Sequence, residues 1–132
     1  MKVLFVCSGN AFRSPVAEAL LKSLRPDWEV DSAGVNPVIP VAESAWRYLA
    51  AEGAQEFLKD NPEGLDEKNL DGYDLIVAME QRHREAVVAR CPRCSLKTVV
   101  WNIRDPYHMP EEYAERVFSQ IKKKVRELAG SL

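Results

Sequence analysis

A thiol and a guanidinium group lie close together near the start of this 132-residue chain, in the segment CSGNAFRSP. Cys7 and Arg13 are separated by five residues. A thiolate is a strong nucleophile, and the planar guanidinium group of arginine can hold two oxygens of an oxyanion at once. This spacing therefore favours a site that binds a tetrahedral anion and attacks it.

The segments on either side of this pair indicate how it is positioned. Residues 2–6 form a short apolar run typical of a buried strand. Ser14-Pro15 then marks the start of a helix, because Ser14 can cap it and Pro15 fits its first position. In a parallel sheet, the loop from a strand into the next helix often binds ligands, because its backbone N–H groups and the helix N-terminus attract anions. Gly9 and Asn10 tolerate the positive φ angles of such loops.

The same positive environment favours the thiolate form of Cys7 near neutral pH. We expect the Ser14 hydroxyl to donate a hydrogen bond to this sulfur and to help it leave in a second step. A single cysteine at a strand end is more often a small buried side chain, so the prediction depends on the combination of Cys7, Arg13 and Ser14.

The rest of the chain alternates between strand and helix patterns. After a first helix that Pro26 ends, we expect strands at 28–35, 74–79 and 96–103 and helices at 41–52, 80–90 and 111–129. Residues 54–72 are irregular, with one helical turn expected near 66–70. Strands separated by helices predict a parallel sheet that is covered on both faces.

Composition narrows the classes of protein that fit. The length suits one domain, and 46% hydrophobic residues are enough for a packed core. A net charge of −2 provides no basic surface for nucleic acid. No apolar run approaches the roughly 18 residues of a membrane span, and the opening apolar stretch is too short for a signal peptide. We therefore expect a soluble cytoplasmic protein with neither nucleic acid nor membrane as a partner.

The string VCSGNAFRSPVAEALL resembles the active-site loop of the low-molecular-weight protein tyrosine phosphatases, a C-x5-R-[ST] motif near the N-terminus. DSAGV, YDLIVAME, DPY and the closing helix follow in the family's order, so the resemblance covers nearly the whole chain. It implies one phosphatase-like domain over residues 1–132. The fold it implies is a three-layer α/β/α structure whose four-stranded parallel sheet has the order 2-1-3-4.

The resemblance also implies a role for each residue of the loop. Cys7 attacks phosphorus, and Arg13 with the loop N–H groups holds the oxygens on which charge gathers. Phosphotyrosine in proteins or a small phosphomonoester is the expected substrate, phosphate-like oxyanions are expected inhibitors, and neither a metal nor another cofactor is expected. The expected substrate-binding residues are Ser8, Gly9, Asn10, Ala11, Phe12, Ser14 and Tyr107.

A second segment, NIRDPYHM, follows the last expected strand. The family places an Asp-Pro pair here, and the resemblance implies that Asp105 protonates the leaving oxygen and later activates water. Pro106 stiffens this loop. The resemblance also implies that Tyr107 forms the aromatic wall that the family has beside its pocket.

Two positions depart from the family pattern. Phe12 stands where animal members carry a second cysteine, so a protective disulfide within the loop is not possible. The loop at 36–42 has Val38 and Ile39 where the family tends to have an aromatic residue, which predicts a pocket wall that is less selective for flat rings.

Cys91 and Cys94 leave a second function open. Arsenate reductases on the related fold pass oxidation from the loop cysteine to two further cysteines. The 80–90 helix should carry this pair away from Cys7, toward the start of the fourth strand, where the two sulfurs form either a disulfide or two free thiols. A zinc site is not expected, because it would need two ligands besides this cysteine pair and only His83 and His108 are available. His83 is expected to lie exposed on the 80–90 helix.

A third alternative is a pseudo-enzyme that only binds phosphate-bearing partners. Such a protein needs the anion-binding loop and Arg13. It needs neither the nucleophile Cys7 nor the acid Asp105, and both are present here.

Overall fold

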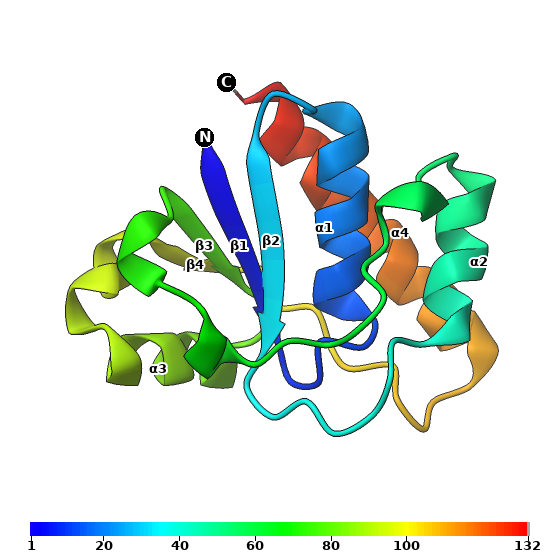
Figure 1. Cartoon of the computed structure of the whole chain (residues 1–132). Helices are drawn as coiled ribbons and strands as arrows, with labels where there is room; N and C mark the ends of the chain where they lie inside the picture. The colour runs from blue at the N-terminus through cyan, green and yellow to red at the C-terminus, as the bar shows by residue number, and fades with distance from the viewer. Residues whose placement is uncertain (132) are drawn as a thin grey trace.

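Four parallel strands form one sheet in the computed structural model, which describes residues 1–131. The strand order is β2-β1-β3-β4 (Figure 1), which confirms the expected order. In register, Cys7 at the end of the first strand pairs with Gly34 at the end of the second. The strands are β1 (Lys2–Cys7), β2 (Glu29–Gly34), β3 (Leu75–Ala78) and β4 (Thr98–Val100).

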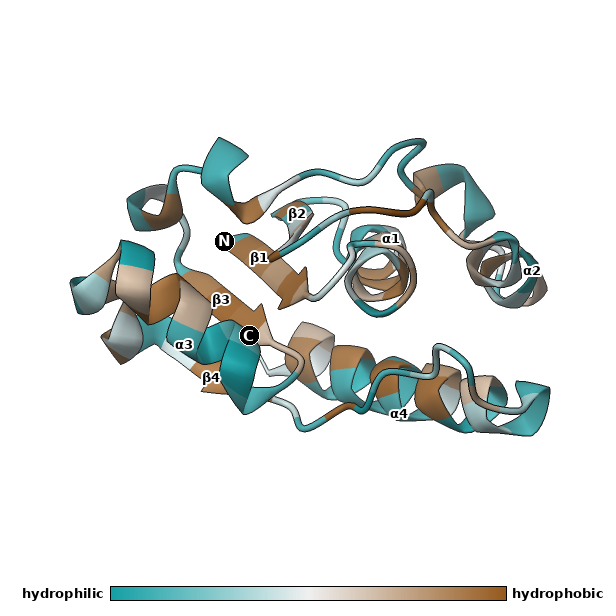
Figure 2. Ribbon diagram, turned by 90° about the horizontal axis from the view of Figure 1, so that it is seen from below, coloured by the Kyte–Doolittle hydropathy of each residue, from teal (hydrophilic) through white to brown (hydrophobic). Residues whose placement is uncertain are grey.

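Helices cover both faces of the sheet, as expected. α1 and α4 lie against each other on one face, with α2 beyond them, and α3 packs on the other face against β1, β3 and β4. Figure 2 shows the hydrophobic strands between these two layers. The helices are α1 (Arg13–Leu24), α2 (Glu43–Ala51), α3 (Gln81–Arg90) and α4 (Glu111–Gly130).

Alternate residues of β1 enter two separate cores, because successive side chains of a strand point to opposite faces. Phe5 and Cys7 belong to the core beneath α1 and α4. Leu4 and Val6 belong to the core beneath α3. The sheet itself therefore separates Cys7 from the side chains on the α3 face.

The fourth strand is much shorter than the range expected at 96–103. Residues Pro92–Lys97 form a 3₁₀ segment whose Leu96 side chain is fully in solvent, and the strand is confined to Thr98–Val100. Asn102 then adopts a left-handed conformation with φ 58°, which ends extended backbone. β4 is an edge strand that pairs only with the four-residue β3, so little holds its flanks extended.

Two other expectations need correction. Residues 54–72 contain three 3₁₀ turns, Gln55–Phe57, Leu65–Glu67 and Leu70–Gly72, rather than one turn near 66–70. The first helix begins at Arg13, with Phe12 at its N-cap position, so Ser14 does not cap it. The Ser14 hydroxyl is instead available to contact the sulfur of Cys7.

Within residues 1–131, no helix combines the length and the apolar character that crossing a bilayer requires.

Candidate active site

A cavity of about 1020 Å³ opens at the carboxyl edge of the sheet, among the loops at the lower end of Figure 1. Three segments, the start of α3 and the start of α4 line it. Ligands of parallel α/β sheets bind at this edge, where loops bring residues from distant parts of the sequence together. The lining includes Cys7, Ser8, Gly9, Ala11, Phe12 and Arg13 from the first loop, residues 35–36 and 38–44 from the second, and 105–109 from the third.

The loop after β1 is held in shape from behind by Asn10. This residue has a positive φ of 53° and is fully buried. Its Nδ2 donates to Ser14 Oγ and to Ser32 Oγ, both at 2.9 Å, and its Oδ1 accepts from Lys59 Nζ at 2.9 Å. The side chain therefore points into the protein and not into the cavity, so only its backbone can contribute to anion binding.

Gly34 lets the end of β2 pass directly under this loop. A Cβ atom at this position would lie 2.8 Å from the backbone nitrogen of Asn10 and 2.8 Å from the carbonyl oxygen of Ser8. Side chains essentially never come so close to backbone atoms, so the loop requires glycine at this position.

Cys7 lies at the base of the cavity with 2% of its surface exposed. Its Sγ lies 2.9 Å from Ser14 Oγ, as the sequence predicts. None of the N–H groups of residues 8–12 donates a backbone hydrogen bond within residues 1–131. These groups and the N-terminus of α1 are thus free to surround an anion beside the sulfur.

Arg13 is buried and its guanidinium group is held on one side. Nη1 donates to Glu80 Oε1 at 2.6 Å and to the Ile103 carbonyl oxygen at 2.7 Å. Burial alone would raise the pKa of Glu80, but hydrogen bonds from Arg13 and Arg82 outweigh it and keep that pKa below its usual value. Glu80 is therefore a carboxylate that fixes Nη1 and leaves the second terminal nitrogen, Nη2, facing the cavity side chains Ser8 and Asp105.

Asp105 and Tyr107 lie on the third loop, which also lines the cavity. Asp105 Oδ2 is 3.7 Å from Arg13 Nη2, and its Oδ1 accepts a hydrogen bond from the Tyr107 backbone at 2.9 Å. Tyr107 is half exposed and its ring packs on His108, with 4.1 Å between ring centroids. The structure thus brings a thiol, a guanidinium group and a carboxyl group to one cavity, although about 90 residues separate the last two.

His83 is a residue of this site that the sequence reasoning missed. It is buried and not exposed as expected, because α3 turns its first-turn side chain back over Ser8. Its Nε2 lies 2.8 Å from Ser8 Oγ, and its Nδ1 accepts a hydrogen bond from the Glu80 backbone at 3.0 Å. Burial, together with the charges of Arg13 and Arg82, lowers the pKa of His83 to about 4. The spacing Glu80-x-x-His83 at a helix start could have indicated this contact.

The wall formed by the second loop is aliphatic, as the sequence predicts. Val38, Ile39, Pro40 and Val41 line this side of the cavity. Phe12 contributes to the lining, but most of its ring is buried edge-on against Tyr48.

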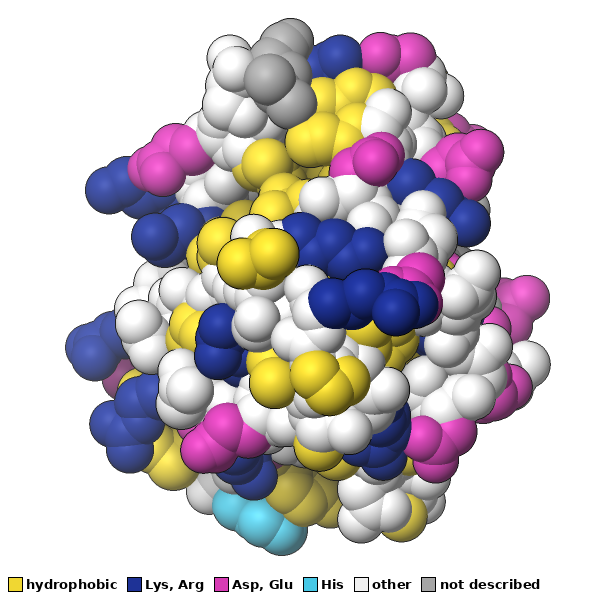
Figure 3. All heavy atoms as spheres, turned by 90° about the vertical axis from the view of Figure 1, so that its left-hand side faces the viewer, with side chains coloured by type: hydrophobic (Ala, Val, Ile, Leu, Met, Phe, Trp, Pro, Cys, Tyr) yellow, Lys and Arg dark blue, Asp and Glu magenta, His cyan; other side chains and the backbone are white. Residues whose placement is uncertain are grey.

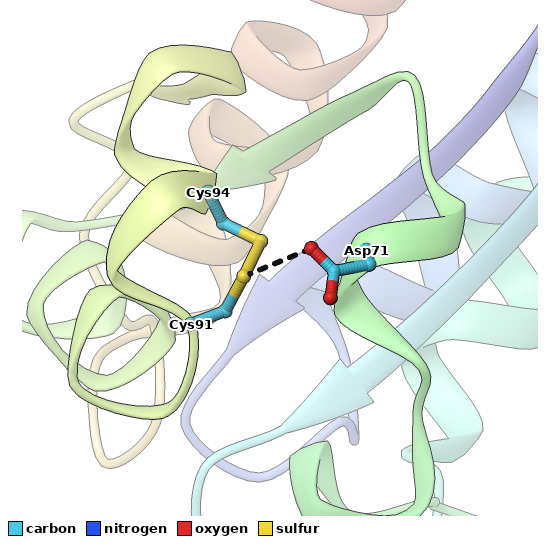
Figure 4. A group of neighbouring side chains, drawn as sticks. All are labelled: Asp71, Cys91 and Cys94. Atoms are coloured by element: carbon cyan, nitrogen blue, oxygen red, sulfur yellow. Dashed lines mark hydrogen bonds between the residues drawn. A yellow bond between two sulfur atoms is a disulfide. The ribbon is translucent and has the colours of Figure 1, made fainter.

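Cys91 and Cys94 form a disulfide at the end of α3, which decides between the two states left open by the sequence. The pair precedes β4, as expected, and lies in the core on the α3 face, whereas Cys7 is in the core on the other face. Asp71 Oδ1 lies 3.4 Å from Cys91 Sγ (Figure 4). Both sulfurs are bonded to each other, so this group of three side chains offers no thiolate to a metal ion.

The face of the molecule drawn in Figure 3 carries many basic side chains, with acidic ones between them. Arg93 and Arg90 form ion pairs with Asp71 and Asp66, respectively. Charges on this face are therefore at least partly neutralised by neighbours.

Comparison with known proteins agrees with this geometry. Residues 2–132 match the family model described as low molecular weight phosphotyrosine protein phosphatase. The low molecular weight protein-tyrosine-phosphatase Etp of Escherichia coli is 31% identical over 138 residues, covering 98% of this chain and 93% of that protein.

Solved structures of phosphatases have the same fold. Vibrio vulnificus Wzb in complex with benzylphosphonate superimposes with a TM-score of 0.89 at 28% identity, covering 99% of this chain and 98% of that one. The YwlE arginine phosphatase from Geobacillus stearothermophilus superimposes with a TM-score of 0.84, also at 28% identity, covering 97% of this chain and 90% of that one.

A parallel α/β sheet with a C-x5-R-S loop at its carboxyl edge is the framework of a cysteine-dependent phosphatase. Within this class, the chain belongs to the low molecular weight phosphotyrosine protein phosphatase family.

Proposed function

We propose that this protein hydrolyses phosphotyrosine in proteins through a phosphocysteine intermediate on Cys7, and that residues 1–132 form its single catalytic domain. The observation that carries the proposal is the convergence of Cys7, Arg13 and Asp105 on one cavity, with free loop N–H groups around the sulfur. Small phosphomonoesters are expected to react by the same route.

In the first step, Cys7 Sγ attacks phosphorus and forms an S–P bond while the ester P–O bond breaks. The proton of the Asp105 carboxyl group passes to the leaving oxygen. Arg13 Nη2 and the loop N–H groups hold the non-bridging oxygens, on which charge gathers in the transition state.

In the second step, the Asp105 carboxylate takes a proton from a water molecule as the water oxygen attacks phosphorus. The S–P bond breaks, inorganic phosphate leaves and the thiolate of Cys7 returns. The Ser14 hydroxyl, 2.9 Å from the sulfur, stabilises the departing thiolate.

Phosphoarginine is a second candidate substrate. The structural relative named as an arginine phosphatase is as identical in sequence to this chain as the tyrosine phosphatase Wzb. The aliphatic wall at residues 38–41 also does not select for an aromatic ring by stacking. We place phosphotyrosine first because Tyr107 also lines the cavity and can pack against the substrate ring.

The reductase alternative has little geometric support. Oxidation can pass from Cys7 to another cysteine only by direct attack of a thiolate on its sulfur. Cys91 and Cys94 lie in the other core, on the far side of the sheet, so neither sulfur can approach Cys7 without local unfolding.

Turnover assays test the proposed function directly. Purified protein should release phosphate from p-nitrophenyl phosphate and from a phosphotyrosine peptide faster than from the matched phosphoarginine peptide. It should reduce no arsenate with a thioredoxin system. A preference for the phosphoarginine peptide would show that phosphoarginine is the substrate. Production of arsenite would show that the protein is a reductase and not a hydrolase.

A nucleophilic thiol must stay reduced to act. This requirement supports the proposal that the protein works in the cytoplasm, where thiols are kept reduced, whereas a disulfide such as Cys91–Cys94 is rare in that compartment and counts against it.

A further inference from the structure

The hydroxyl group of Ser8, the residue after the nucleophile, is contacted by two side chains. His83 Nε2 lies 2.8 Å from Ser8 Oγ, and Arg13 Nη2 lies 3.4 Å from it. The guanidinium group can only donate. The role of the histidine depends on its tautomer, which a third contact decides.

The backbone of Glu80 determines this tautomer. Its N–H group points at His83 Nδ1 at 3.0 Å, so Nδ1 must be the acceptor nitrogen of the ring. In a neutral imidazole the other nitrogen then carries the proton. His83 therefore donates from Nε2 to Ser8 Oγ.

Ser8 Oγ thus accepts from both neighbours and retains one proton of its own. Among residues 1–131, the side-chain contacts of Ser8 Oγ are with His83 and Arg13, which are both donors, so no acceptor for this proton is found there. Ser8 lines the cavity beside Cys7 and Arg13. Its hydroxyl proton is consequently directed to whatever the cavity holds.

We propose that Ser8 donates a hydrogen bond to a non-bridging oxygen of the phosphoryl group during transfer, and that His83 is the positioning residue that orients this hydroxyl. The inference rests on the proposed phosphatase function and adds a side-chain donor to the loop N–H groups and Arg13. Negative charge on these oxygens is greatest in the transition state, so the donor should act mainly on kcat.

The position of His83 maintains the required tautomer. Four charged groups act on the ring. Burial and the positive charges of Arg13 and Arg82 lower its pKa to about 4, and they outweigh the carboxylates of Glu80 and Asp105, which raise it. A protonated ring would turn Nδ1 into a second donor facing the Glu80 N–H group. The neutral ring is therefore the form present at the pH of the reaction.

Ser8→Ala tests the donor itself. We expect kcat for p-nitrophenyl phosphate to fall roughly tenfold or more, the scale of a lost hydrogen bond to a charged group, with KM changed less than about twofold. Ser8→Thr keeps the hydroxyl and should retain most of the activity. Ser23→Ala, at the exposed end of α1, is the matched control and should behave like the wild type. Unchanged kcat in Ser8→Ala would overturn the proposal.

His83 variants test the positioning role. His83→Phe keeps a ring but cannot donate, so kcat should fall toward that of Ser8→Ala, whereas His83→Gln supplies a donor and should recover part of the loss. Glu85→Gln, on the exposed side of α3, controls for effects of altering this helix. The double variant Ser8→Ala/His83→Phe should be no slower than Ser8→Ala, to within about twofold. Fully additive losses would show that His83 does not act through Ser8.

Two measurements remain decisive even if the protein shows no turnover. Calorimetry should find that Ser8→Ala weakens vanadate binding by roughly tenfold and phosphate binding by less, because vanadate resembles the transition state. Ring nitrogen NMR at pH 7 should show His83 with its proton on Nε2. Equal vanadate affinity, or a proton on Nδ1, would overturn the inference, whereas absent turnover with these results would overturn only the proposed function.

Discussion

Cys7, Arg13 and Asp105 are each held by contacts that form before any substrate is bound. Ser14 contacts the sulfur, Glu80 and a backbone carbonyl hold one side of the guanidinium group, and a backbone N–H group holds the Asp105 carboxylate. Catalysis by charge stabilisation depends on such preorganised groups, because they need no reorganisation during the reaction. Substitutions that keep the shape of these residues should therefore change rates more than binding.

Replacement of the nucleophile is the first test at this scale. Cys7→Ser should abolish turnover of p-nitrophenyl phosphate, because a serine hydroxyl is not ionised near neutral pH. Phosphate and vanadate binding, measured by calorimetry, should remain detectable because Arg13 and the loop N–H groups are unchanged. Retention of more than a few per cent of the wild-type rate would show that another atom attacks phosphorus.

Replacement of the acid should depend on the leaving group. Asp105→Asn should slow phosphorylation of Cys7 by aryl phosphates with poor leaving groups by roughly 10²-fold, the usual scale of general acid catalysis. Esters with very good leaving groups need less protonation and should lose less in this step. Rapid-quench measurement with both kinds of ester checks the prediction, and an equal loss for both would place the acid elsewhere.

At the scale of elements, the site depends on how closely the β1–α1 loop lies over the end of β2. Asn10 ties the loop to Ser32 of this strand, and Gly34 leaves room for the loop backbone. The first turn of α3 adds His83, and the N-cap residue before this helix adds Glu80. The loop is thus supported by two elements that are distant from it in sequence.

Gly34→Ala should disrupt this support. The added Cβ would lie 2.8 Å from backbone atoms of the loop, which must shift, at a cost of about 1–3 kcal/mol in the free energy of unfolding. Phosphatase activity should fall strongly because the loop N–H groups move with it. Gly130→Ala is the matched control, since within residues 1–131 no atom beyond its chain neighbours and its own helix backbone lies within 4 Å of the added Cβ. Denaturant unfolding and turnover measured together check both effects, and wild-type behaviour of Gly34→Ala would contradict the packing argument.

The disulfide at the end of α3 should contribute to stability and not to catalysis. Cys91→Ser/Cys94→Ser should keep near-normal phosphatase activity, because both sulfurs lie in the core opposite Cys7. Closing so short a loop stabilises a protein by about 2 kcal/mol, so the variant should unfold a few degrees lower. Scanning calorimetry under non-reducing conditions measures this, with reduced wild type as the control.

Thiol trapping after exposure to arsenate should find no bond between Cys7 and either cysteine.

At the scale of the whole molecule, stability should depend on pH through His83. Its pKa is about 4 in the folded protein, below the ordinary value of 6.5, because it is buried near Arg13 and Arg82. The unfolded chain therefore binds a proton below pH 6.5 that the folded protein does not bind until about pH 4. The free energy of unfolding should fall as pH decreases between these values, by at most about 3 kcal/mol from this residue.

Comparison with His83→Phe isolates this contribution from the carboxylates that titrate nearby. Urea unfolding at several pH values should show that the wild type loses more stability than the variant between pH 6.5 and 4. Above pH 6.5 the difference between the two proteins should be constant. A parallel loss in both proteins would show that His83 titrates normally in the folded state.

Much of this protein could be predicted from local sequence. Segment 7–14 alone predicts the chemistry of the site, because the thiol, the guanidinium group and the loop are neighbours along the chain. Alternating strand and helix patterns predict the parallel sheet, and the strand order that the structure confirms is implied by the resemblance to the family. Local patterns also place Cys91 and Cys94 correctly before β4.

Only the tertiary structure decided which side chains hold the site together. Glu80 and His83 reach Arg13 and Ser8 across 67 and 75 positions of sequence, and Asn10 turns inward to Ser32 instead of toward the ligand. The length of β4 and the disulfide also depended on contacts outside their own segments. Local propensity reports what a segment prefers in isolation, whereas these contacts exist because the register of the sheet and the packing of α3 bring distant residues to the same edge.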